Sequence, residues 1–165
     1  MARRAQVDIR KARPEDESRV QTILTEAFGG PAEARLVTAL RRDRDLTVER
    51  VAIIDGQVAG YIGFSLHRSP RDWMCLAPVA VLPAQQGRGI GAELVRYGLD
   101  AARRKGARAI TVLGDGRFYR RFGFTYAAAE NLGTPYDPAH TLLYPIAPGT
   151  AFAAERLSYA AAFDS

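Results

Sequence analysis

The alternation of apolar and polar positions along the chain predicts several short strands. Residues 6–11 alternate like a strand. The runs 48–54 and 58–64 are rich in β-branched and aromatic residues, and Asp55-Gly56 between them is a strong signal for a two-residue hairpin, so we expect these two strands to be antiparallel. Further extended segments are expected at residues 74–82, 109–113, 124–128 and 142–146.

Three other segments have the spacing of helices that pack on a sheet. Acidic residues follow Pro14, apolar residues then recur at i, i+3, i+4 and i+7, and Gly29-Gly30-Pro31 ends this first helix. A second helix is expected at residues 32–42. The third begins near Ile90, has one apolar and one charged side, and ends at Lys105-Gly106.

The third helix joins two strands and therefore fixes part of the topology. It runs between the strands at 74–82 and 109–113, and such a crossover connects parallel neighbours. Because the hairpin is antiparallel, we expect a mixed sheet flanked by helices. A short segment at 117–122 follows, and the tail at 151–165 receives no assignment.

Composition limits the class of protein. The chain has 165 residues, of which 47% are hydrophobic, so a single globular domain over residues 1–165 is expected. Its 23 Lys+Arg and 18 Asp+Glu give a net charge of +5, which favours acidic partners. The cations alternate with acids, as in Arg41-Arg-Asp-Arg-Asp45, so no nucleic-acid partner is expected.

Cys75 is the only cysteine, which excludes a disulfide within the chain and a multi-cysteine metal site. We expect it in the core and expect no metal. The first residues contain no apolar run typical of secretion, and no segment has membrane-spanning length, so we expect a cytoplasmic protein without membrane contact. The sequence does not decide whether the protein forms a homodimer, because no feature marks a subunit interface.

The most informative stretch is a glycine-rich turn between an apolar strand and the third helix. Gly87, Gly89 and Gly91 allow the backbone to approach an anion closely, and the start of the helix supplies free amides and the positive end of its dipole. The sequence therefore predicts that a phosphate group binds at this turn.

Two other interpretations of this turn stay open on the residues alone. Gly87-Arg-Gly-Ile-Gly-Ala92 satisfies the dinucleotide pattern G-x-G-x-x-A, and Asp115 follows the next strand, where a ribose-binding acid belongs. Five residues, 82–86, separate the strand from the first glycine, and the antiparallel hairpin fits such a fold poorly. The turn could also be merely structural. No G-x-x-x-x-G-K-[ST] sequence occurs, which excludes a nucleoside-triphosphate loop of that type.

Two motifs together resemble the GNAT superfamily of N-acetyltransferases. Gln86-Gly-Arg-Gly-Ile-Gly91 matches the cofactor motif of that family, and Arg117-Phe-Tyr-Arg-Arg-Phe-Gly-Phe124 matches a second family segment at the usual separation. Within the superfamily the chain is most similar to YhbS-like bacterial acetyltransferases, through Glu26-Ala-Phe-Gly29 and Val112-Leu-Gly-Asp115. The resemblance implies an α/β fold of the α+β type, with a mostly antiparallel central sheet and a splayed parallel pair.

The resemblance also implies a cofactor and its site. Acetyl-CoA would lie between the strands that end near Leu82 and Leu113, where the sheet of this family splays apart. The residues expected to bind its pantetheine and pyrophosphate groups are Val79, Ala80, Val81, Gln86, Gly87, Arg88, Gly89, Ile90, Gly91 and Ala92.

By the same resemblance, Tyr119 is the general acid that protonates the departing thiolate, and the backbone amide near Val81 stabilises the oxyanion. The acceptor, a primary amine on a small molecule, peptide or protein, would enter near Phe28 and Glu33. Residues 73–82 contain no acid or histidine, where many family members place a general base, so no base is assigned. A domain that binds acyl-CoA without transferring the acyl group stays an alternative.

Overall fold

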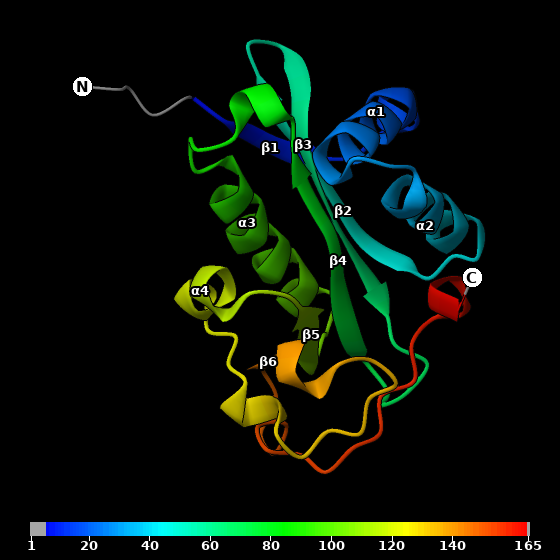
Figure 1. The fold of residues 1–165 in the computed structure, drawn as a ribbon, viewed down its shortest axis with the longest axis vertical. Helices are drawn as coiled ribbons and strands as arrows, with labels where there is room; N and C mark the ends of the chain where they lie inside the picture. Colours follow the sequence, from blue (N-terminus) through cyan, green and yellow to red (C-terminus); the bar gives the residue numbers. More distant parts are fainter. Residues whose placement is uncertain (1–5, 165) are drawn as a thin grey trace.

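The structure is a computed structural model that describes residues 6–164 (Figure 1). Over this range the strands form one sheet whose order in space is their order in the sequence. All neighbouring strands are antiparallel except β4 and β5, which are parallel. The strands are β1 Asp8–Lys11, β2 Leu46–Ile54, β3 Gln57–Leu66, β4 Trp73–Val81, β5 Ala109–Leu113 and β6 Thr141–Pro145.

Helices cover both faces of this sheet. On one face, α1 (Glu17–Phe28) and α2 (Ala32–Arg42) lie side by side, whereas α3 (Ile90–Arg104) crosses the other face (Figure 1). The apolar side of α3 packs on the largest core cluster through Ile90, Leu94 and Val95, all of them buried. The mixed sheet between helices confirms the predicted fold class.

Local sequence signals account for the best-predicted elements. Asp55 and Gly56 both have positive φ angles, of 49° and 77°, which is the geometry of a tight hairpin turn whose twist matches that of the flanking strands. Helix α2 has the expected bounds, and α1 begins after a 3-10 turn at Pro14–Asp16. Helix α1 ends at Phe28, and Gly29 follows as its C-terminal cap with a φ of 71°, as expected from the glycine at this position.

The sheet forks between β4 and β5. These strands pair only from Trp73 to Cys75 on β4, opposite residues 109–111 on β5, and they separate beyond that point. The rest of β4 continues to pair with β3 on its other side. Pro78 lies in the separated part and has no N–H to offer a neighbouring strand. The fork therefore leaves one edge of β4 open.

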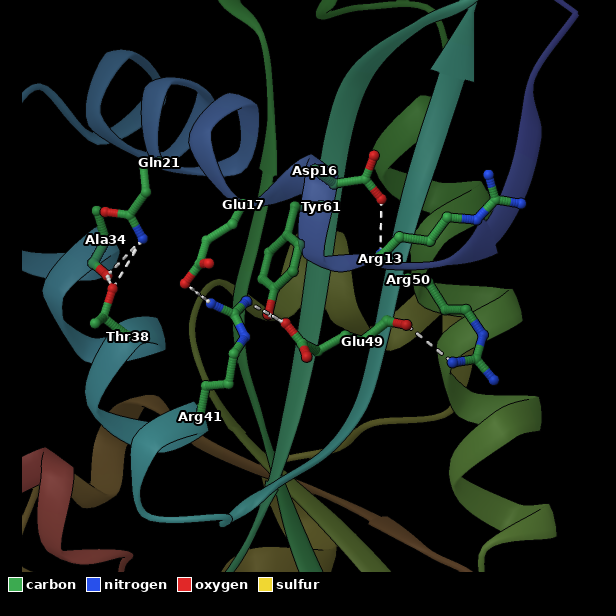
Figure 2. Close-up of polar contacts among 10 residues, drawn as sticks. All are labelled: Arg13, Asp16, Glu17, Gln21, Ala34, Thr38, Arg41, Glu49, Arg50 and Tyr61. Atoms are coloured by element: carbon green, nitrogen blue, oxygen red, sulfur yellow. Dashed lines mark hydrogen bonds and ion pairs between the residues drawn. The ribbon is translucent and has the colours of Figure 1, made fainter.

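A polar network anchors the two helices to the sheet (Figure 2). Arg41 of α2 contacts Glu17 of α1 at 2.8 Å and Glu49 of β2 at 2.5 Å. The buried Tyr61 of β3 donates a hydrogen bond to the same Glu49 carboxylate at 2.9 Å. This network joins four elements and so holds the loop between α1 and α2 at a fixed place over the sheet.

One predicted strand is wrong. Residues 124–128 were expected to be extended, but only Thr125 pairs, in an isolated bridge with Leu143, and the chain then turns into a 3-10 helix at Ala127–Ala129. The Thr125 hydroxyl accepts a hydrogen bond from the Ala128 amide at 3.1 Å, which favours a turn at this point.

The unassigned C-terminal tail is mostly irregular and completes the core. Leu157 and Tyr159 cover Trp73 and Cys75, so Cys75 is buried as expected. The 3-10 turn Ala161–Asp164 lies beside α2 (Figure 1). Ser165 lies outside the described residues. Among the helices of residues 6–164, none combines the length and the apolar character needed to cross a membrane.

Candidate active site

The glycine-rich turn has the geometry of an anion site. Gly87 and Gly89 have φ angles of 81° and 80°, a left-handed conformation that other residues rarely adopt. No side chain caps α3, and its first helical hydrogen bond is donated by Glu93 to Gly89. The amides of residues 90–92 therefore have no partner within the helix and are directed, with the helix dipole, at the turn.

The open edge of β4 presents backbone groups to the fork. The Leu82 amide donates to Ala59 on the β3 side. Backbone direction alternates along an antiparallel strand, so Val79 and Val81 are directed away from β3, into the fork. The Val81 carbonyl indeed accepts a hydrogen bond from the Gln86 side chain at 3.1 Å, on the side away from β3.

Three adjoining hollows form one groove along this edge. A hollow of about 310 Å³ contains Tyr119 and Phe28, and it shares Val81, Gln86, Gly91 and Phe118 with a hollow of about 410 Å³ at the glycine turn. A third hollow, of about 310 Å³, shares residues with the second and continues past the start of α3. The groove thus joins the glycine turn to Tyr119.

The far end of the groove is cationic. Arg88, Arg96 and Arg121 line the third hollow, together with one acid, Glu93. The Arg121 guanidinium carbon lies 4.9 Å from the centre of the Phe118 ring, a cation–π contact that steadies the side chain. Three guanidinium groups beside free helix amides favour a ligand that carries several phosphates.

Tyr119 lies at the end of α4 (Gly116–Tyr119), at the other end of the groove. Its ring contacts those of Phe118 and Phe124 edge-on, with centroids 4.9 and 5.7 Å away. Burial raises the pKa of Tyr119 to about 12, and the neighbouring Cys75, where ionised, would raise it further. The phenol is therefore protonated near neutral pH, and its hydroxyl makes no hydrogen bond to another residue in 6–164.

A residue that the sequence analysis missed holds the turn before α4. The Tyr126 hydroxyl accepts a hydrogen bond from the Gly116 amide at 2.9 Å and donates one to the Gly114 carbonyl at 3.2 Å. Asp115, between them, caps α4 by accepting from the Arg117 amide at 2.8 Å. No local pattern signals the role of Tyr126, because its partners lie ten and twelve residues away.

Residues 17–124 match the family described as the acetyltransferase (GNAT) family. The chain belongs to this family. It is 40% identical over 128 residues to the uncharacterized N-acetyltransferase YhbS of Escherichia coli K12, covering 75% of this chain and 77% of YhbS. It is also 34% identical over 122 residues to the uncharacterized N-acetyltransferase YjhQ of the same strain, covering 70% and 67% of the two chains.

Solved structures of GNAT proteins have the same fold. The crystal structure of E. coli YhbS in complex with CoA superposes with a TM-score of 0.90 at 32% identity, covering 100% of this chain and 96% of that one. A GNAT acetyltransferase from Brucella melitensis, in complex with acetyl-CoA, gives 0.83 at 37% identity, with 97% and 99% covered. These matches confirm the family resemblance. A dinucleotide domain would need a largely parallel sheet, which this GNAT chain does not have.

The GNAT fold brings most of the predicted site residues together. Val79, Ala80 and Val81 line the groove, as does the whole run from Gln86 to Ala92. Phe28 lies in the same hollow as Tyr119, with 46% of its surface exposed. Glu33 is half-buried at the start of α2 and does not line this groove.

The acids Asp115 and Glu26 and the histidine His67 lie outside the hollow that contains Tyr119 in this GNAT chain. Asp115 is occupied as a helix cap, and Glu26 is exposed on α1. His67 is buried below the fork, with its Nε2 atom 2.7 Å from the Thr111 hydroxyl. Burial lowers the pKa of His67 to about 4, so the ring is neutral. None of the residues that line the hollow around Tyr119 is an acid or a histidine.

Proposed function

We propose that the protein transfers an acetyl group from acetyl-CoA directly to a primary amine, with both substrates bound at once and Tyr119 as the general acid. The observation that carries this proposal is the continuous groove from three arginines, past the glycine turn and the open edge of β4, to Tyr119. Its cationic end suits the phosphates of CoA, and its uncharged end suits the acetyl thioester. Two similar GNAT proteins were crystallised with CoA and with acetyl-CoA.

The groove supports a specific placement of the cofactor. The pyrophosphate would lie on the amides at the start of α3, with the Gln86 and Arg88 side chains beside it. The pantetheine amides would pair with the open edge of β4 at Val79 and Val81, like an added strand. Ala80, whose backbone is directed toward β3, would line the hollow instead.

In the proposed reaction the lone pair of a neutral amine attacks the thioester carbonyl carbon. The Val81 amide donates a hydrogen bond to the carbonyl oxygen as charge develops on it. The C–N bond forms, the C–S bond breaks, and the thiolate takes the Tyr119 phenol proton, which water then restores. Because no acid or histidine lines this hollow, the amine proton passes to water.

Transfer of the Tyr119 proton requires that the donor and the leaving group have similar proton affinities. A phenol with a pKa of about 12 would be a weak acid toward an ordinary thiolate, whose thiol has a pKa of about 8.5. Burial raises the pKa of the nearby Cys75 thiol to about 12. A CoA thiolate formed beside the buried Tyr119 ring would itself be shielded from water, which would make it more basic and favour transfer from Tyr119.

Phe28 would border the entry of the amine, because it lines the hollow that contains Tyr119. Glu33 would attract a cationic acceptor that approaches over the loop between α1 and α2. The chemistry of these two residues admits a small amine, a lysine side chain or an amino terminus.

Calorimetric titration with acetyl-CoA, CoA and NAD at one ionic strength tests the cofactor assignment. We expect micromolar binding of acetyl-CoA and CoA and none of NAD. Gly89→Ala should weaken CoA binding, because alanine is strained at a φ of 80°. Gly30→Ala is the matched control, since Gly30 has an ordinary φ and open space around it. NAD binding without CoA binding would refute the proposal.

A screen of amines for release of free CoA thiol separates an enzyme from a domain that only binds acyl-CoA. Amine-dependent thiol release supports transfer. Tight CoA binding without thiol release for any of a small amine, a lysine peptide and a free amino terminus would favour the binding domain.

A further inference from the structure

A second cavity lies at the end of β4 away from the glycine turn. Its volume is about 490 Å³, larger than any of the three hollows of the groove, with which it shares no residue. It is lined by residues just before β4, around position 134 and in the C-terminal tail. We propose that this cavity binds a small organic anion, a carboxylate or a phosphate ester, between Arg68 and Arg156.

Both arginines lie on backbone segments that are tied together. The Arg68 amide donates to the Ser158 carbonyl at 2.7 Å, and the Ser158 amide donates to Ser69 at 2.9 Å. The segment with Arg156 forms a parallel bridge to Gly133, in which the Leu157 amide donates to the Gly133 carbonyl at 2.8 Å. The backbone that carries the two exposed arginines is therefore fixed, so ligand binding does not have to order these segments.

Among the residues that the structure describes, neither guanidinium group is tied to a neighbouring side chain. Within residues 6–164, neither the Arg68 nor the Arg156 side chain makes a hydrogen bond or an ion pair, whereas Arg10 and Arg41 are paired with carboxylates. The lining contains one acid, Asp164, so cations outnumber anions there by two to one. A planar guanidinium binds a carboxylate or phosphate through two parallel hydrogen bonds, which makes an oxyanion the fitting ligand.

One aromatic residue, Tyr159, lines the cavity, and neighbouring rings pack against it. Tyr159 is buried, and its ring contacts those of Tyr136 and His67 edge-on, with centroids 4.8 and 4.6 Å away. Burial raises the pKa of both tyrosines, so their phenols stay neutral. The Tyr136 hydroxyl donates to the Phe163 carbonyl at 3.2 Å and fixes the turn that carries Asp164. The neutral Tyr159 and the apolar Leu157 in a lining with two cations suit the carbon skeleton of an organic anion.

Amide chemical shifts of ¹⁵N-labelled protein, titrated with citrate and separately with inorganic phosphate at constant ionic strength, test this site. Saturating CoA is present, so that the glycine turn does not compete for the probes. We expect saturable shifts at Arg68, Ser69, Thr134 and Ser158. The affinities measured in the citrate titration and in the phosphate titration show which of the two oxyanions the site prefers.

The double variant Arg68→Gln/Arg156→Gln should weaken probe binding by about 10-fold or more, the usual effect of losing charged hydrogen bonds. It should keep CoA binding, which shows that the chain is folded. Arg35→Gln is the control, because Arg35 is exposed on α2 and lines neither the groove nor the cavity. Absence of saturable shifts with both probes, or equal weakening in the control, would overturn the proposal whether or not the protein transfers acetyl groups.

Discussion

The ring of Tyr119 occupies the space that a side chain at Gly114 would need. A Cβ atom at Gly114 would lie 2.4 Å from Cε2 of Tyr119, a distance that real contacts do not reach. The Tyr119 ring therefore packs against the Gly114 backbone on one side and against aromatic rings on the other. Its position depends on the turn at residues 114–116 as much as on α4.

Replacing Tyr119 by phenylalanine removes the proposed proton donor and keeps the ring. We expect kcat to fall by about 100-fold or more, the usual effect of losing a general acid, with calorimetric affinity for acetyl-CoA close to wild type. Tyr97→Phe makes the same change on an exposed part of α3 and should have no effect. An unchanged kcat in Tyr119→Phe would remove the phenol from the mechanism.

Gly114→Ala should displace the Tyr119 ring. The added methyl group overlaps Cε2 and Cδ2 of the ring, so we expect kcat to fall and unfolding stability to drop by about 1–3 kcal/mol, as for other overpacked sites. Gly133→Ala is the control, because its Cβ atom would make only ordinary contacts at 3.8 Å. Steady-state kinetics and urea unfolding measure the two effects, and wild-type kinetics would contradict the close packing.

Tyr126→Phe should loosen the turn that carries Tyr119. The change leaves the Gly116 amide and the Gly114 carbonyl without their bonds to the hydroxyl, which costs about 1–3 kcal/mol where the groups are shielded from water. We expect kcat to fall while the affinity for CoA, whose proposed phosphate site lies on α3, is kept. A parallel loss of CoA affinity and kcat would instead indicate general unfolding.

His67 should make folding stability depend on pH below neutrality. Its pKa is about 4 in the folded protein and about 6.5 when unfolded, so between these values the unfolded chain binds the proton more tightly. Stability is therefore complete above pH 6.5 and falls as the pH drops toward 4. At about 1.4 kcal/mol for each pH unit between the two pKa values, the loss reaches about 3 kcal/mol.

Urea unfolding at several pH values, with a His67→Gln variant, checks this expectation. The variant should be less pH-dependent between pH 6.5 and 4, because glutamine does not titrate. Identical slopes in wild type and His67→Gln would show that His67 does not carry the effect.

Glu49 should matter more as a hydrogen-bond acceptor than as a charge. Glu49→Gln retains an acceptor oxygen for the buried Tyr61 hydroxyl. Glu49→Leu removes the acceptor of both the Tyr61 hydroxyl and the Arg41 guanidinium. We expect the leucine variant to lose about 1–3 kcal/mol of unfolding stability and the glutamine variant less. Chemical denaturation of both variants measures the difference, and equal losses would contradict this ranking.

The sequence predicts the elements whose causes are local. The hairpin at Asp55-Gly56, the bounds of α2 and the glycine turn before α3 each depend on residues within a few positions of one another. The cofactor-binding residues were predicted through a family resemblance, and the structure places them along one groove, while their roles stay predictions. Tyr126 and the arginine-lined cavity were not predicted, because their contacts join residues ten to ninety positions apart. Residues 124–128 were predicted wrongly for a different, local reason: the hydrogen bond from the Ala128 amide to the Thr125 hydroxyl turns this run away from the sheet.

The strict chain order of the sheet has a consequence for how the protein forms. Each strand from β2 to β6 pairs with the strand that immediately precedes it in the sequence, so each can add to an edge that already exists. Even the parallel step from β4 to β5 needs only the intervening α3 to close. Pairing of near neighbours keeps the loop-closure entropy of each step small, which favours rapid folding. The sheet, and the fork within it, can therefore assemble progressively from β1 toward β6.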